Sequence, residues 1–62
     1  MRNKRKLEKA IDFSLMGFKE GEMIGNRFQH LVRTYITKYG TNDLIDEQVR
    51  EYEEEWRKRG RE

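Results

Sequence analysis

The sequence predicts an all-α fold, a small three-helix unit over about residues 4–20, 24–39 and 43–59 that is completed by dimerisation. Three observations support this prediction. Apolar residues recur at spacings of three and four, which is the period of an amphipathic helix, and no stretch alternates apolar and polar residues for long enough to form a strand. Proline, which would interrupt a helix, is absent from the 62 residues.

The first helix is predicted from an apolar stripe that steps by four, three and four residues. The stripe consists of Leu7, Ile11, Ser14 and Phe18. Because Ser14 lies within this stripe, we expect its hydroxyl to be packed rather than to act as a nucleophile. The helix follows a basic segment, MRNKRK, and the two ends of the single domain 1–62, at residues 1–5 and 60–62, are expected to fray.

The stretch GFKEGEMIG, from Gly17 to Gly25, decides where the first helix ends. A continuous helix would place Gly21 and Gly25 in one unbroken apolar seam, where a second backbone could approach closely. However, each interior glycine costs roughly 0.5–1 kcal/mol relative to alanine, so a break is favoured. We therefore predict a turn near residues 20–25, followed by Asn26, which with the glutamine three residues later resembles a capping box.

The second and third helices repeat the same apolar spacing and meet at a clear boundary. Gly40 stands where a left-handed C-terminal cap is favoured, and Thr41, Asn42 or Asp43 can cap the next helix. The two stripes consist of Ile24, Phe28, Leu31 and Tyr35, and of Ile45, Val49, Tyr52 and Trp56. Each helix therefore has one apolar side for a common core.

The net charge of +2 conceals an asymmetry between the two parts of the chain. Residues 1–40 carry nine Lys and Arg against four Asp and Glu, whereas residues 41–62 carry five against eight. A partner with a negative surface would therefore meet a basic first half.

The polar face of the second helix is the leading candidate site. Between Glu22 and Asp43 the sequence contains no acidic residue. Arg, Asn and Thr side chains bond to phosphates and base edges, and a helix that presents them after a short turn suits a helix-turn-helix reader. We therefore predict a nucleic-acid-binding regulatory protein, with DNA as the expected ligand. Its site comprises Asn26, Arg27, His30, Arg33, Thr34 and Lys38. An ordinary solvated face is the other interpretation.

The basic N-terminal segment extends this hypothesis. Arg2, Lys4, Arg5 and Lys6 would form a mobile arm that adds counterion-release affinity or enters a minor groove. A solvated segment without a binding role is the alternative interpretation of these four residues.

The third helix offers an alternative function. Residues 43–55 carry seven acids and one cation, Arg50, beside two aromatic residues. An acidic face with exposed aromatic anchors can dock on a basic protein partner, as an inhibitor or adaptor does. This protein-interaction site would comprise Glu51, Tyr52, Glu55 and Trp56. The competing interpretation is that the two aromatic residues complete the core.

Other classes of function find no support in the composition. With no cysteine and one histidine, the chain can form neither a disulfide nor a thiolate or histidine-rich metal site. No glycine-rich phosphate loop follows a strand, and His30 has no carboxylate at a spacing that would orient it. We therefore predict no enzymatic activity, no cofactor and no small-molecule substrate.

Localisation and assembly follow from the same composition. No uncharged run approaches the ~18 residues of a membrane-spanning helix, so we predict a cytoplasmic protein without a membrane partner. A core this small usually needs a second subunit, and the seven aromatic residues are many for it, so self-association into a homodimer is expected. Small, charge-rich chains without cysteine are also typical of phage or plasmid accessory proteins.

Overall fold

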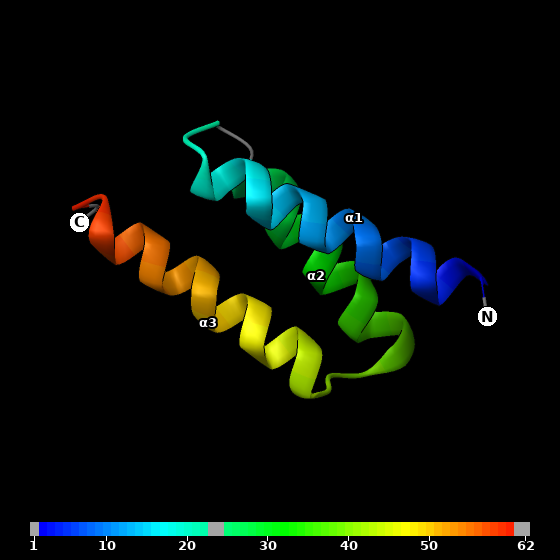
Figure 1. Cartoon of the computed structure of the whole chain (residues 1–62). Helices are drawn as coiled ribbons and strands as arrows, with labels where there is room; N and C mark the ends of the chain where they lie inside the picture. Colours follow the sequence, from blue (N-terminus) through cyan, green and yellow to red (C-terminus); the bar gives the residue numbers. More distant parts are fainter. Residues whose placement is uncertain (1, 23–24, 61–62) are drawn as a thin grey trace.

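The computed structural model describes residues 2–22 and 25–60, with the exception of the Arg2 side chain. These residues form α1 (Arg2–Lys19), α2 (Gly25–Tyr39) and α3 (Asp43–Lys58), and Figure 1 shows how the three helices lie against one another. The predicted all-α, three-helix fold is confirmed, with helix ends within two residues of the predicted ones. None of the described helices is both long enough and apolar enough to span a membrane.

Helix α1 packs against both of the other helices. The start of α2 lies beside the end of α1, because Gly25 comes close to the Phe18 ring, so these two helices run antiparallel. Helix α3 runs parallel to α1. Asp12 accepts a hydrogen bond from Gln48 Nε2 at 3.1 Å, and further along both helices Phe18 contacts the Trp56 ring. Figure 1 shows the resulting pair, α1 on α2, with α3 alongside.

The core is built from the predicted stripes of all three helices. Burial of apolar surface at roughly 25 cal/mol per Å² is the main force that holds such a unit together. Ser14, within the α1 stripe, is only 1% exposed, which agrees with its expected packing role. The buried apolar residues are Ile11, Leu15, Phe18, Phe28, Val32, Tyr35, Ile45 and Tyr52.

The break after α1 is a glycine-ended helix cap. Gly21 has φ +98°, in the left-handed region that favours glycine. The Glu22 N–H donates to the Gly17 carbonyl at 3.0 Å, and the Gly21 N–H donates to the Phe18 carbonyl at 3.1 Å. These two bonds are the pair that defines a Schellman cap, so the predicted turn is confirmed. Gly40, with φ +81°, ends α2 in the simpler left-handed cap.

One prediction about a helix start was wrong, and another helix begins earlier than its predicted start. Asn26 does not cap α2, because that helix already begins at Gly25, and the Gln29 side chain bonds to the Tyr52 hydroxyl instead. Helix α1 includes residues 2–5, whose fraying we expected. In these first turns, the Lys4 ammonium lies 5.8 Å from the centre of the Tyr39 ring of α2.

One hydroxyl joins all three helices. Tyr35, on α2, is fully buried, and its Oη donates to Glu8 Oε2 of α1 at 2.8 Å. The same oxygen accepts from Asn42 Nδ2 at 3.1 Å. Asn42 is the N-cap of α3, where its Oδ1 accepts from the Ile45 N–H at 2.9 Å. The start of α3 is therefore tied to both α1 and α2.

We expect Asn42→Ala to lower the free energy of unfolding by about 1–2 kcal/mol, because it removes both the cap and the bond to Tyr35. For a chain of this size, each kcal/mol lowers Tm by roughly 4–8 °C. Thermal unfolding followed by circular dichroism measures the change. Thr41→Ala is the control, because this neighbour makes only an exposed bond to Asp46. Equal stability of the two variants would contradict the role of Asn42.

Candidate functional site

The candidate nucleic-acid face lies on the side of α2 away from the core. The 3.6-residue period that turns Phe28, Val32 and Tyr35 inward turns the intervening polar residues outward. The structure leaves five of the six predicted α2 site residues exposed: Asn26, Arg27, His30, Arg33 and Lys38. The predicted residues thus share one continuous surface of a single 15-residue helix.

Thr34 differs from the rest of this face. It is half-buried, and its Oγ1 donates to the His30 carbonyl at 2.9 Å. The hydroxyl hydrogen is therefore used within the helix, as is common for threonine in helix interiors. Thr34 can still accept a hydrogen bond, but it is not a free donor for a ligand.

The N-terminal cations do not form the predicted mobile arm, because they belong to the first turns of α1. At about 100° per residue, position 4 points away from positions 5 and 6, so Lys4 does not share a surface with Arg5 and Lys6. Lys4 lies by Tyr39, at the end of α2, whereas Arg5 lines a shallow depression near Leu44 on the α3 side. Lys6 is exposed. The predicted role of the Arg2 side chain lies outside the described residues.

The cations of α2 have no acidic partner in the part of the chain that the structure describes. There, the one salt bridge joins Lys19 of α1 to Glu51 of α3 at 3.1 Å. Arg27, Arg33 and Lys38 are exposed, and α2 itself contains no carboxylate. Their charge is therefore available to an outside ligand.

The alternative site on α3 is divided by the fold. Tyr52 is only 4% exposed, and its ring stacks on Phe28 at 4.5 Å and contacts Phe18 at 4.7 Å. It therefore belongs to the core and is not an exposed anchor, so that part of the alternative prediction was wrong. Trp56 and Glu55 are half-buried, and Glu51 is engaged by Lys19. The predicted acidic and aromatic residues do not share one exposed face.

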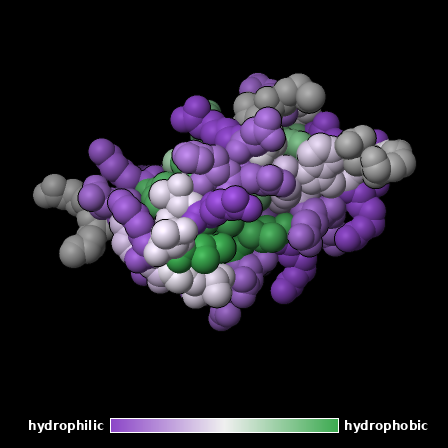
Figure 2. All heavy atoms as spheres, turned by 180° about the vertical axis from the view of Figure 1, so that it is seen from behind, coloured by the Kyte–Doolittle hydropathy of each residue, from purple (hydrophilic) through white to green (hydrophobic). Residues whose placement is uncertain are grey.

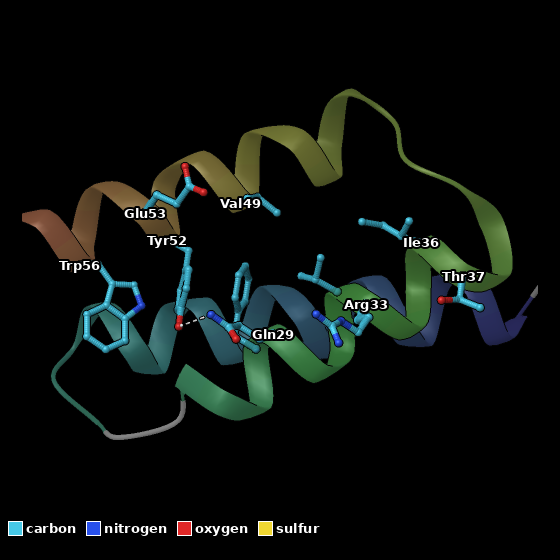
Figure 3. A pocket seen from close by; sticks show the side chains of 10 residues that line it. Gln29, Arg33, Ile36, Thr37, Val49, Tyr52, Glu53 and Trp56 are labelled. Carbon is cyan, nitrogen blue, oxygen red and sulfur yellow. Dashed lines mark hydrogen bonds between the residues drawn. The ribbon is translucent and has the colours of Figure 1, made fainter. Parts of the chain in front are cut away.

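A groove between α2 and α3 is the main concave feature that the sequence did not reveal. It has a volume of about 590 Å³. Figure 3 shows Ile36 and Val49 directed toward each other from opposite sides, with Trp56 at one end. Seen from the far side of the molecule, hydrophobic atoms form a band bordered by hydrophilic ones (Figure 2). The lining residues are Phe28, Gln29, Val32, Arg33, Ile36, Thr37, Val49, Tyr52, Glu53 and Trp56.

The two sides of this groove differ in character. Gln29 reaches across and donates to the Tyr52 hydroxyl at 3.3 Å, which closes one part of the floor. Arg33 and Thr37 stand on the α2 rim, and Glu53 stands on the α3 rim. The sequence feature that could have indicated the groove is Ile36, an apolar residue beside the α2 stripe. It remains 41% exposed in the structure.

Comparisons with protein-family models, curated proteins and solved structures found no match to this chain. No group of three or more His, Cys, Asp or Glu residues that could hold a metal ion occurs among the residues described.

The core assignment of Tyr52 gives a stability prediction. We expect Tyr52→Ala to cost about 3–5 kcal/mol, because it removes a buried ring that touches two others. That loss is comparable to the whole stability of a domain of this size, so the variant should be largely unfolded. Tyr52→Phe keeps the ring and should cost only about 1 kcal/mol. Urea unfolding followed by circular dichroism distinguishes these values, and a cost below 1 kcal/mol for Tyr52→Ala would contradict the assignment.

Proposed function

We propose that this protein binds nucleic acid through the exposed face of α2, with duplex DNA as the expected ligand. One observation carries the proposal: the three cations of α2, Arg27, Arg33 and Lys38, are exposed, and α2 contains no carboxylate. Phosphate contacts from Arg and Lys supply most of the affinity in such complexes.

The charge of α2 is difficult to explain by stability alone. A helix start carries partial positive charge from its unpaired N–H groups, so acids are favoured in the first turn. Helix α3 follows this rule with Asp43 and Asp46. Helix α2 has no acid in its first turn, and it carries Arg27 two residues after its start. A phosphate group near Arg27 would favour both the guanidinium and the helix start.

The other residues of the face provide suitable chemistry for positioning a ligand. The Asn26 amide can donate and accept, and the His30 imidazole can do so when neutral. Both are exposed next to Arg27. Lys4 adds a cation where α1 meets the end of α2, at the Tyr39 ring. Positive groups therefore accompany α2 from its start to its end.

The alternative function, binding of a basic protein partner by α3, has less support after the burial of Tyr52. Helix α3 still carries seven acids, but it lacks a fully exposed aromatic anchor. Failure of the nucleic-acid experiment below would make this alternative the next one to test.

We expect the protein to bind a labelled random DNA duplex with a strong dependence on salt. If the three cations of α2 each neutralise one phosphate, the slope of log K against log salt is about −2.7, so affinity falls about 40-fold between about 50 and 200 mM salt. The double variant Arg27→Glu with Lys38→Glu should abolish binding, because it places acids on the phosphate-facing side. Fluorescence anisotropy measures both effects.

Lys9→Glu with Lys58→Glu is the matched control, because it changes the net charge by the same amount at exposed positions on α1 and α3. This control should retain most of the affinity. No binding of the wild type even at low salt, or an equal loss in both double variants, would contradict the proposed face. Circular dichroism checks that each variant remains helical.

A further inference from the structure

The outward side of α1 carries two large apolar side chains that the other two helices leave uncovered. Phe13 is 73% exposed, the highest value among the large hydrophobic residues that the structure describes. Met16, three residues later, is 49% exposed. The buried residues of this helix, such as Ile11, Leu15 and Phe18, occupy its opposite side. An exposed aromatic ring of this kind is a favoured centre for a protein contact.

The residues around Phe13 follow the spacing by which one helix packs on another. Five of them step by four, three, four and three residues, so they lie along one side of α1. These five residues, which we call the α1 seam, are Lys6, Ala10, Phe13, Gly17 and Glu20. Gly17 lies inside the helix and not at a left-handed position such as that of Gly21, so its backbone does not require glycine. Small residues at positions 10 and 17 leave room for the close approach of a second helix.

The two ends of the α1 seam carry opposite charges at equal distances from its apolar centre. Lys6 comes seven residues before Phe13 and Glu20 seven residues after it, which is about 10 Å in each direction at 1.5 Å per residue. Both charged residues are exposed. Among the residues described, neither side chain has a salt-bridge or hydrogen-bond partner. The seam is therefore complementary in charge to its own reversed copy.

We propose that the α1 seam binds the α1 seam of a second copy of this chain, with the two helices antiparallel. A two-fold axis perpendicular to α1, at the level of Phe13, places the two Phe13 rings together at the centre. It also places Lys6 of each copy opposite Glu20 of the other, so two ion pairs form. An axis parallel to α1 would place Lys6 on Lys6 and Glu20 on Glu20, where like charges repel. The equal spacing on either side of Phe13 thus selects a second copy as the occupant and sets its direction.

This contact lies on α1, whereas the proposed nucleic-acid face lies on α2, so each copy keeps a complete face. A monomer that binds duplex DNA would overturn only the dimer, and a dimer that does not bind would overturn only the α2 face. Lys9 borders the seam, so the molar mass of the DNA control Lys9→Glu with Lys58→Glu is measured as well. A weaker dimer in that control leaves the cations of α2 unchanged.

The test is the molar mass in solution, measured by sedimentation equilibrium. We expect the wild type to be a dimer. Phe13→Glu should give monomers, because it places two carboxylates against each other on the two-fold axis. Its side chain lies outside the core, so the fold should be retained, which circular dichroism checks. Ile36→Glu is the control, because this residue is 41% exposed on α2, away from the seam, and should leave the dimer intact.

Charge reversal tests the pairing of Lys6 with Glu20. Lys6→Glu alone and Glu20→Lys alone should each raise the dimer dissociation constant at least about tenfold, because each turns two attractive contacts into repulsive ones. Combining both changes in one chain should restore the dimer. Glu54→Lys is the matched control, because it makes the same charge change at an exposed position on α3 and should leave the dissociation constant unchanged.

Mixing the two single variants provides a readout that a folding defect cannot produce. In the mixed dimer, the acids at positions 6 and 20 of one variant lie opposite the cations at positions 20 and 6 of the other. Both ion pairs are then present, so the mixture should associate at least about tenfold more tightly than either variant alone.

The contrary results are also specific. A monomeric wild type at about millimolar concentration would overturn the proposal and leave this side of α1 to a different partner. A dimer that Ile36→Glu dissociates and Phe13→Glu does not would assign the contact to α2 instead. A dimer that Phe13→Glu dissociates, but that neither single charge reversal weakens, would overturn the antiparallel pairing.

Discussion

The fully buried hydroxyl of Tyr35 is the interaction on which the arrangement of the three helices depends. It donates to Glu8 on α1 and accepts from Asn42, the residue that caps α3. A buried hydroxyl without partners would be costly, so the three groups hold one another in place. This bond anchors α3 at its start, and Tyr52 anchors it on Phe18 and Phe28 further along. The groove follows the α2–α3 boundary, and Tyr52 and Phe28 are part of its lining.

The helices and their ends could be predicted because their causes are local. The 4-3-4 spacing of apolar residues needs only the helical period, and Gly21 and Gly40 mark ends because left-handed backbone favours glycine. For Tyr52 the same spacing left two interpretations open, a core position and an exposed anchor, and the structure shows the core position. Its spacing placed it on the apolar stripe, but whether it was covered depended on where Phe18 and Phe28 lie in space.

The candidate surfaces also differ in whether a local sequence pattern is enough to predict them. The exposed face of α2 follows from the period of one helix, and the structure leaves Asn26, Arg27, His30, Arg33 and Lys38 exposed on it. Their binding role stays a prediction. The basic N-terminal segment was interpreted as an arm, whereas in the structure it forms the first turns of α1, where Lys4 lies by Tyr39 of α2. The groove depends on how two helices lie relative to each other, and no local pattern specifies that.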